Sequence, residues 1–369
     1  MKFRVERDVL ADSVAWAART LPSRPSLPVL AGLVLTAESD SLTLSSFDYE
    51  VSGKVTVAAD ITAPGTVLVS GRLLADIARA LPAQPVTIEN EGTRVVVTCG
   101  RSSFTLPTLP VEDYPQLPAM PESSGKVTGT AFASAVAQVA IAAGKDDTLP
   151  TLTGIRMEFE GANITLAATD RYRLAVRELM WHPQTSSISH QVLVLARTLS
   201  ESAKALADVD DVMIALSSGG QGEGLIGFEG AGRRTTTRLL DGDFPKYRTL
   251  LPTESSAIAS VDTATLVDAV KRVSLVAERN TPVKLAFDNG ELTLRAGTGD
   301  EARAEEVLEC SLDGDAIDIA FNPAYLLDGL SALGSATSQF SFTQANKPAV
   351  LSGEADDYKY LLMPVRLTG

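Results

Sequence analysis

Hydrophobic residues recur at helical spacing in three segments that lie about one third of the chain apart. These segments are residues 70–81 (SGRLLADIARAL), 195–206 (LARTLSESAKAL) and 321–333 (FNPAYLLDGLSAL). A helix can bury one apolar stripe against a sheet or another helix while its other face stays in water. The pattern therefore predicts three amphipathic helices at equivalent positions of an internal repeat.

The two faces of the first of these helices differ in character. Leu74, Ala78 and Leu81 fall at i, i+4 and i+7 and share one side, whereas Arg72 and Arg79 are seven residues apart and share the other. The second segment repeats this arrangement with Arg197 and Lys204 on its polar side. We expect the apolar stripe to face a core and the basic residues to face solvent or a ligand.

Each third of the chain also begins with an apolar helical stripe and continues with strand patterns. The stripe residues are Leu10, Val14 and Ala17, then Phe132, Val136 and Val139, then Leu266, Val270 and Val273. Polar turns precede three alternating triplets, which are residues 42–44 (LTL), 164–166 (ITL) and 292–294 (LTL). Chance similarity between amphipathic segments explains one shared element more readily than several elements in the same order.

The repeat predicts the fold class and the domains. Each unit of about 120 residues has two helices and several short strands, an α+β pattern in which helices lie on antiparallel sheets. Pro, Ser and Glu gather near residues 119–126 and 252–258, as is typical of linkers. We therefore expect three similar domains at residues 1–120, 127–252 and 257–369.

Composition limits what these domains can do. The 369 residues are 45% hydrophobic and 21% charged, with a formal net charge of -14, which argues against wholesale coating of nucleic acid but permits one basic face. The two cysteines lie far apart, so no disulfide framework is indicated. Charged residues interrupt the apolar N-terminus, and the apolar run at 131–144 is too short to span a bilayer. We expect a cytoplasmic protein without membrane contact.

Candidate chemistry is sparse. The sequence has no G-x-x-x-x-G-K-[ST] phosphate-binding loop, and His182 and His190 flank a polar loop without cysteine or carboxylate partners at metal-ligand spacing. Paired carboxylates such as Asp146 and Asp147 are typical of solvated turns. We therefore predict that the protein has no catalytic residues, no metal site and no cofactor, and that it is not an enzyme.

Two stretches are harder to attribute to scaffold alone. Residues 169–174 (TDRYRL) follow a predicted strand and place two arginines and a tyrosine on a turn. Residues 360–367 (YLLMPVRL) are apolar until Arg366. This C-terminal run is either a terminal strand or part of a peptide groove, because proline fits poorly in a central strand and methionine often lines adaptable grooves.

The chain resembles the bacterial DNA polymerase III β subunits, the sliding clamps. The residues that carry the resemblance span the full length, and their combination is specific. They are MKFRVERDVL at residues 1–10, RPSLPVL at 24–30, ATDRYRL at 168–174, FPKYR at 244–248, and residues 360–367. The resemblance implies a head-to-tail homodimer of three-domain protomers, which forms a ring around duplex DNA with helices lining the hole.

In that family the clamp tethers a polymerase by topology and binds DNA without reading its sequence. The resemblance implies partners that include duplex DNA, the DNA polymerase III α subunit, a clamp-loader complex, and other polymerases and repair proteins that carry a clamp-binding motif. The implied DNA-facing residues are Arg24, Arg72, Arg79, Arg197, Lys204, Lys271 and Arg272. In the third domain Ala324 and Ser331 replace the arginines, so we expect Lys271, Arg272 and Arg279 to supply its basic charge.

Partner proteins of the family insert a short motif into a hydrophobic pocket between the second and third domains. The implied pocket residues are Leu152, Thr169, Arg171, Tyr172, Arg173, Leu174, Pro245, Thr249, Leu250, Leu361, Met363, Pro364, Val365 and Arg366. Two departures bear on this pocket. Many relatives have Gly-His where this chain has Arg171 and Tyr172, and Thr368 and Gly369 extend beyond the usual terminal Arg-Leu.

The resemblance also implies a dimer seam between the first domain of one protomer and the third domain of the next. Its implied residues are Arg101, Phe104, Leu106, Leu275, Val276, Glu301 and Glu305, with Arg101 facing the acidic residues. Two other functions stay open at this point. One is a β-rich repeat scaffold that binds only proteins, and the other is an enzyme with a site between domains.

Overall fold

The computed structural model describes the chain except for residues 218–223, 278–280, 298–301, 356 and 367–369. The chain divides into two compact units. The first unit comprises Met1–Thr130, His182–Thr185 and Lys204–Leu239, and the second comprises Ala131–Trp181, Ser186–Ala203 and Leu240–Gly369. Helices α3 (Gly129–Ala140) and α4 (Ala196–Ala205) contain residues at which the chain passes from one unit to the other.

The first unit is built on a 14-stranded antiparallel sheet with the order β14-β10-β16-β17-β18-β4-β3-β2-β6-β9-β8-β7-β1-β5. Its strands are β1 (Lys2–Val5), β2 (Gly32–Glu38), β3 (Ser41–Phe47), β4 (Val51–Ala58), β5 (Asp60–Ala63), β6 (Gly65–Ser70), β7 (Val86–Asn90), β8 (Arg94–Cys99), β9 (Ser102–Leu109), β10 (Ser123–Val127), β14 (His182–Pro183), β16 (Val212–Leu216), β17 (Leu225–Gly230) and β18 (Arg233–Arg238). Two 3-10 turns, η1 (Pro28–Ala31) and η2 (Val111–Asp113), join them. The pairing of β18 with β4 makes this sheet continuous across residues far apart in the sequence.

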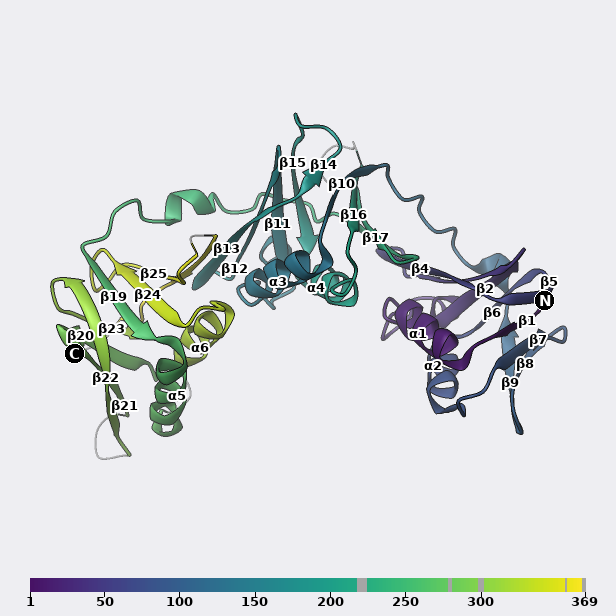
Figure 1. Cartoon of the computed structure of the whole chain (residues 1–369), viewed down its shortest axis with the longest axis horizontal. Coiled ribbons are helices and arrows are strands. Elements are labelled where there is room, and N and C mark those ends of the chain that lie inside the picture. The colour runs from purple at the N-terminus through teal and green to yellow at the C-terminus, as the bar shows by residue number, and fades with distance from the viewer. Residues whose placement is uncertain (218–223, 278–280, 298–301, 356, 367–369) are drawn as a thin grey trace. The chain divides into compact units, whose positions relative to one another are not determined.

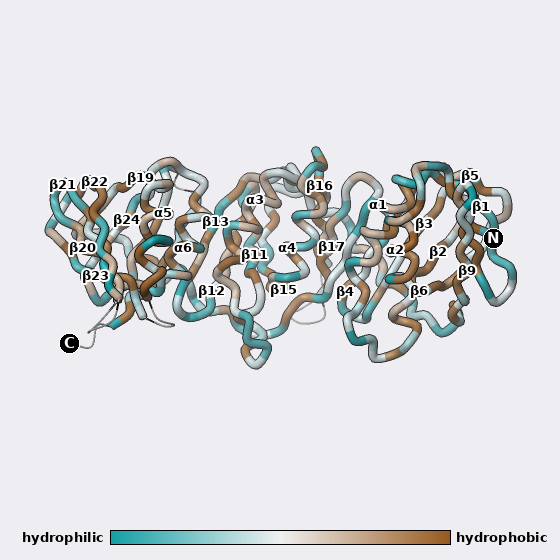
Figure 2. The backbone as a smooth tube through the Cα atoms, turned by 90° about the horizontal axis from the view of Figure 1, so that it is seen from below, coloured by the Kyte–Doolittle hydropathy of each residue, from teal (hydrophilic) through white to brown (hydrophobic). Residues whose placement is uncertain are grey.

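Two helices cover one face of this sheet. Helix α1 (Arg7–Ala18) packs on β3 and β4 and against α2 (Gly71–Ala80), which lies on β2 and β6 (Figure 1). The predicted stripe of α2 is buried, whereas Arg72 and Arg79 are exposed. Hydrophobic positions concentrate along β2, β3 and β6 and hydrophilic ones at the connecting turns (Figure 2). The amphipathic pattern therefore predicted the inner and outer faces of this helix correctly.

The second unit is built on a 12-stranded antiparallel sheet with the order β15-β11-β12-β13-β26-β25-β24-β19-β22-β21-β20-β23. Its strands are β11 (Gly154–Glu160), β12 (Asn163–Thr169), β13 (Arg173–Met180), β15 (Ser189–Leu195), β19 (Ala257–Asp262), β20 (Val283–Asp288), β21 (Gly290–Ala296), β22 (Ala304–Gly314), β23 (Ile317–Phe321), β24 (Thr337–Phe342), β25 (Ala349–Ser352) and β26 (Tyr358–Leu362). Helices α5 (Thr263–Val273) and α6 (Pro323–Ala332) pack against each other. The described part of this unit also contains the 3-10 turns η3 (Pro150–Thr153), η4 (Tyr247–Leu250) and η5 (Ser274–Val276).

The ends of α5 and α6 show why these segments become helical. The Asp262 carboxylate accepts a hydrogen bond from the Thr265 backbone N–H at 2.8 Å and so caps α5. The Asn322 side chain caps α6 by accepting from the Ala324 N–H at 2.9 Å, and Pro323 occupies the first helical position, where no N–H is needed. The helices predicted at residues 70–81, 195–206 and 321–333 are confirmed as α2, α4 and α6.

The C-terminal apolar run divides into two parts. Strand β26 lies between β13 and β25, and its pairing with β13 places Leu361 opposite Leu174. Beyond Leu362 the chain leaves the sheet, and the Met363 backbone N–H donates to the Tyr172 carbonyl at 2.9 Å. The expected terminal strand is therefore present, and Met363 to Arg366 lie outside it, where Pro364 removes no hydrogen bond from the ladder.

The turn between β12 and β13 has an unusual backbone. Arg171 has a φ of 81°, in the left-handed region that disfavours side chains other than glycine. Side chains of the same turn hold it there. The Thr169 hydroxyl accepts from the Arg171 N–H at 3.2 Å, and the Asp170 carboxylate accepts from the Tyr172 and Arg173 N–H groups at 3.0 and 3.1 Å.

We expect Arg171→Gly to leave the free energy of unfolding unchanged or to raise it by up to about 1 kcal/mol, because relief of the left-handed strain offsets the extra entropy of glycine in the unfolded chain. Glu178→Gly, at an exposed position of β13, should lower the free energy of unfolding by about 1 kcal/mol. Urea-induced unfolding of both variants measures the difference. Equal losses in the two variants would show that the turn carries no strain.

Candidate functional site

A cavity of about 480 Å³ lies in the second unit beside the β12–β13 turn. The turn contributes its own residues, the segment after α3 supplies the opposite side, and α6 adds one aromatic ring. The lining residues are Ala143, Gly144, Lys145, Asp146, Leu149, Leu152, Asp170, Arg171, Tyr172, Arg173 and Tyr325. Four residues of the predicted pocket, Leu152, Arg171, Tyr172 and Arg173, are thus brought together, and Tyr325 joins them without having been predicted.

Arg173 forms the inner wall of this cavity. Its side chain is 6% exposed and donates to Asp170 at 2.9 Å, to Asp328 at 2.6 Å and to the Tyr360 hydroxyl at 3.4 Å. Its guanidinium also lies over the Tyr325 ring, 4.3 Å from the centroid. Burial by itself lowers the pKa of Arg173, but its hydrogen bond to the Asp328 carboxylate and its other partners raise the pKa well above its usual value. Arg173 is therefore a permanently charged structural group whose donors are already engaged.

Tyr172 forms the rim of the cavity. Its side chain is 54% exposed and stacks on Tyr325, with ring centroids 6.3 Å apart, and the Arg171 guanidinium lies over the Tyr172 ring, 5.9 Å from its centroid. Because the Met363 N–H binds the Tyr172 carbonyl, the exposed thioether of Met363 belongs to the same region. The rim is therefore an aromatic surface suited to an apolar or aromatic side chain.

A hydrophobic cluster forms next to this cavity on the second sheet. Its buried members are Ala167, Leu174, Val176, Leu193, Phe244, Tyr247, Val350 and Leu361, with Leu240 and Leu251 packed against it. Leu174 and Leu361 were predicted to line the peptide pocket, yet both are almost fully buried, so they can act only as a floor. Leu250, Met363 and Val365 are exposed apolar side chains in this part of the chain.

The remaining predicted pocket residues occupy different environments. Thr169 is buried and donates to the Arg173 carbonyl at 2.7 Å, so it stabilises the turn. Pro245 and Pro364 are half-buried, whereas Thr249 and Arg366 are exposed. Thr368 and Gly369 lie outside the described residues.

The seven predicted DNA-facing cations named above are all exposed, but several already have partners within the chain, and Arg279 lies outside the described residues. Arg72 donates to the Pro22 carbonyl at 3.0 Å, and Arg197 pairs with Glu201 at 3.0 Å. Arg272 binds Glu306 through two nitrogens, at 3.1 and 2.5 Å, and Lys271 lies 3.9 Å from Asp268. Exposed pairs of this kind contribute little stability and exchange readily for other anions.

Strands β9 and β22 each have an edge that is open over part of their length among the described residues. Residues 102–107 of β9 pair only with β8, and residues 304–310 of β22 pair only with β21. Phe104, at 37% exposed, lies on the first of these edges, and Val307, an exposed residue that was not predicted, lies on the second. Side chains alternate between the two faces of a strand, and Val307 is exposed on the same face of β22 as Glu305 and Glu309. An apolar residue between two glutamates on an exposed face is the signal that sequence reasoning missed.

The other predicted seam residues are placed as follows. Leu275 is 84% exposed, Arg101 is exposed and Val276 is half-buried. Leu106 is 0% exposed because its side chain enters the core of the first unit, so only its backbone is available at the edge. Glu305 pairs with Arg295 at 2.6 Å, and Glu301 lies outside the described residues.

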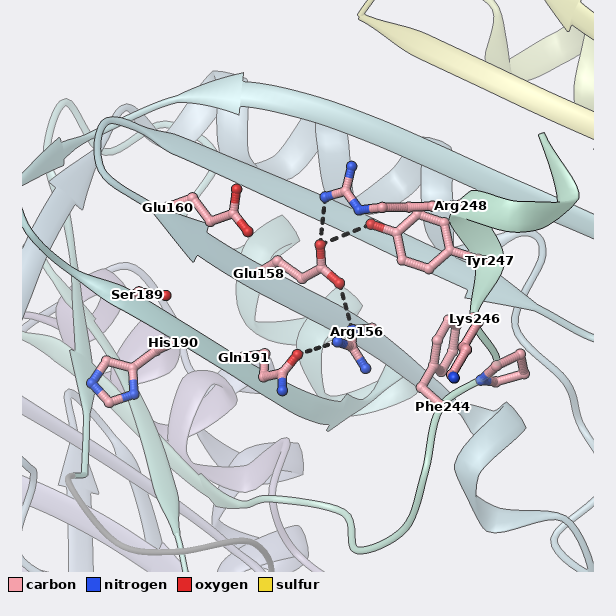
Figure 3. A pocket seen from close by; sticks show the side chains of 11 residues that line it. Arg156, Glu158, Glu160, Ser189, His190, Gln191, Phe244, Lys246, Tyr247 and Arg248 are labelled. Atoms are coloured by element: carbon pink, nitrogen blue, oxygen red, sulfur yellow. Dashed lines mark hydrogen bonds and ion pairs between the residues drawn. The ribbon is translucent and has the colours of Figure 1, made fainter. Parts of the chain in front are cut away.

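A second cleft, of about 470 Å³, lies on the second sheet beside η4 (Figure 3). Glu158 of β11 occupies its centre and is 8% exposed. Its carboxylate accepts hydrogen bonds from Arg156 at 2.6 Å, from the Tyr247 hydroxyl at 2.9 Å and from Arg248 at 2.6 Å. Burial raises the pKa of Glu158, but the hydrogen bonds from Arg248, Tyr247 and Arg156 outweigh it and hold the pKa below its ordinary value. Sequence reasoning did not predict this buried charge.

Within the described residues, no group of three or more His, Cys, Asp or Glu side chains is arranged to hold a metal ion. His182 and His190 are both exposed, as the sequence indicated, and His190 lies at the edge of the second cleft (Figure 3). A search of the described helices finds none with the length and apolar character needed to cross a membrane.

Comparison with known proteins agrees with this architecture. Models of the N-terminal, central and C-terminal domains of the DNA polymerase III beta subunit match residues 1–118, 126–246 and 248–366. The beta sliding clamp of Streptomyces coelicolor is 64% identical, and the alignment covers 100% of each chain.

Two solved structures extend the comparison to three dimensions. The DNA polymerase sliding clamp from Bacillus subtilis has a TM-score of 0.93 at 26% identity and covers 100% of this chain and 99% of its own. The sliding clamp from Pseudomonas aeruginosa bound to griselimycin has a TM-score of 0.93 at 30% identity, with 100% of both chains covered. With three clamp domains matched along its length, the chain belongs to the DNA polymerase III beta subunit family, the sliding clamps.

Proposed function

We propose that this protein is a processivity clamp, a ring that encircles duplex DNA and tethers the replicative polymerase to it. The observation that carries the proposal is the full-length match, at 64% identity, to a beta sliding clamp. A ring of this kind confers processivity by topology alone, because it cannot leave the DNA without opening or reaching a free end. The proposal includes the domain limits 1–120, 127–252 and 257–369.

The ring would form from two protomers joined head to tail. The open edge of β9 on one protomer would pair with the open edge of β22 on the other, with Phe104, Leu275 and Val307 buried at the seam. Such an interface is heterologous, and a rotation that closes it produces a ring. Pairing also removes two exposed strand edges, which would otherwise promote aggregation.

Duplex DNA would pass through the ring against the exposed cations of α2, α4 and α5 and Arg24. These side chains would meet phosphates and release counterions, so binding would be independent of sequence and sensitive to salt. A net charge of -14 on the whole chain is compatible with this, because the field at one face depends on its own charges. The intrachain pairs of Arg197 and Arg272 would exchange their carboxylate partners for phosphates.

Partners would bind at the cavity of Leu152, Tyr172 and Tyr325 and at the exposed apolar side chains of Leu250 and Met363 beside it. These partners would be the DNA polymerase III α subunit, a clamp-loader complex, and other polymerases and repair proteins with a short clamp-binding segment. Such a segment is held by a few apolar anchors within a polar rim. A β-rich scaffold that binds only proteins is the alternative, and it predicts no retention on DNA.

Loading the protein with a clamp loader onto nicked circular DNA tests encirclement. We expect the protein to stay on the circle during gel filtration and to be lost when a restriction enzyme linearises the DNA, because a ring slides off free ends. Retention that is equal before and after cutting would replace encirclement with ordinary groove binding. Absence of retention on either form would favour the protein-binding scaffold.

Substituting Met363 with alanine tests the partner site. We expect Met363→Ala to weaken binding of a labelled polymerase III α peptide by about 10-fold, as is typical when a buried anchor is truncated, with dimer assembly unchanged. Met180→Ala removes another exposed methionine, from β13, and should leave affinity within twofold. Fluorescence anisotropy gives both affinities, and equal values for the two variants would remove Met363 from the site.

A charge at the seam tests the dimer. Leu275→Asp should shift the protein from dimer to monomer in sedimentation velocity, because an unpaired carboxylate would be buried when the seam closes. The fold should be retained, since Leu275 is 84% exposed within the chain. Ile258→Asp, at another exposed apolar position, is the control and should stay dimeric. A dimer that survives in Leu275→Asp would move the seam elsewhere.

A further inference from the structure

The chain between β18 and β19 contains a strap, residues 240–251, that crosses the second sheet. At its start the Leu240 N–H donates to the Leu193 carbonyl at 2.8 Å, and beyond its end the Ser256 N–H donates to the Phe342 carbonyl at 2.7 Å. Among the described residues, the hydrogen bonds that leave the chain between Leu240 and Ser256 are those of Tyr247 and Arg248 to Glu158. The middle of the strap therefore has one polar anchor.

Sheet register shows what the strap covers. Side chains alternate between faces along a strand, and Glu158 pairs opposite Thr165, two residues before Ala167. Ala167 pairs with Val176, and Leu174 pairs with Leu361, so all of these side chains lie on the same face as Glu158. The Phe244 and Tyr247 rings of the strap pack on this apolar surface. Such apolar packing does not fix one orientation for η4.

Glu158 fixes the orientation of η4 through hydrogen bonds. Its carboxylate points toward η4 and receives the Tyr247 hydroxyl and the Arg248 guanidinium on one oxygen, while Arg156 of its own strand binds the other (Figure 3). Hydrogen bonds to a charged group are strong and directional, especially when the group is largely buried. The next two residues of η4 after Arg248 are Thr249 and Leu250, whose side chains are exposed in the proposed partner site.

We infer that Glu158 is a positioning residue for partner binding, which holds η4 so that Thr249 and Leu250 stay in place to receive the peptide. This inference rests on the proposed clamp function. Glu158 itself does not touch the partner. It acts through Tyr247, whose ring packs with Leu174 and Leu361 at the floor of the site.

The same strand offers a matched control. Glu160 lies two residues along β11 on the same face, lines the same cleft and has its charge near Arg248. It is exposed, and among the described residues it forms no hydrogen bond to η4. Glu160→Gln therefore removes an equal charge from the same cleft without removing the anchor.

The test compares the full-length variants Glu158→Gln, Tyr247→Phe, their combination and Glu160→Gln. The probe is a fluorescein-labelled synthetic peptide of the polymerase III α clamp-binding segment, measured by anisotropy well below the melting temperature. We expect Glu158→Gln and Tyr247→Phe each to weaken binding by about 3- to 10-fold, and the combination to lose little more than either one. Glu160→Gln should stay within twofold of the parent.

Amide hydrogen exchange supplies a readout that a general loss of stability would not reproduce. Exchange should accelerate at residues 246–251 in Glu158→Gln while the strands of the second sheet keep their protection. Unchanged peptide affinity in Glu158→Gln would overturn the inference, even if its melting temperature fell. If Glu158→Gln fails to fold, Tyr247→Phe decides, since it removes only a hydroxyl. A parent protein that does not bind the peptide would overturn the proposed function and the inference with it.

Discussion

Main-chain pairing between β13 and β26 is the interaction on which the candidate partner site depends. It joins strands that are more than 170 residues apart in the sequence into one sheet, and it places Leu174 opposite Leu361. Without this ladder the β12–β13 turn and the segment after β26 would have no fixed position relative to each other. The Met363 N–H on the Tyr172 carbonyl continues the same line of backbone contacts beyond the strand. An aromatic rim and an apolar floor can therefore meet at one place.

Polar side chains secure the two borders of this site in similar ways. Arg173 is surrounded by Asp170, Asp328 and the Tyr325 ring, and Glu158 is surrounded by Arg156, Tyr247 and Arg248. Each central charge is largely buried and has several partners, which is the arrangement that compensates the cost of removing an ion from water. These two charges are consequently held behind the apolar and aromatic side chains of the candidate site, whereas Lys145, Asp146 and Arg171 line the cavity as exposed charges.

Local features of the fold could be predicted from the sequence, because they depend on residues close together in the chain. The stripe of Leu74, Ala78 and Leu81 specifies both the helix and its buried face, and the turn before residues 42–44 specifies a hairpin. Periodicity could not predict that β18 pairs with β4 or that β13 pairs with β26. The alternation of apolar and polar residues along a strand shows which face of the sheet each residue occupies, but it does not identify the neighbouring strand. The same limit applies to the site. The pocket residues came from a family resemblance, whereas Tyr325, Asp328 and Glu158 become recognisable only when remote strands are adjacent.

The continuous ladders inside the protomer have a mechanical consequence. The β18–β4 and β13–β26 joints each hold five residue pairs, and their hydrogen bonds lie side by side, so separating either pair of strands loads several bonds at once. Covalent linkers span these joints as well. In the proposed ring of two such protomers, the proposed β9–β22 seam would lack such a covalent linker. A force that opens the proposed ring would therefore separate the seam before it separates either ladder within a protomer.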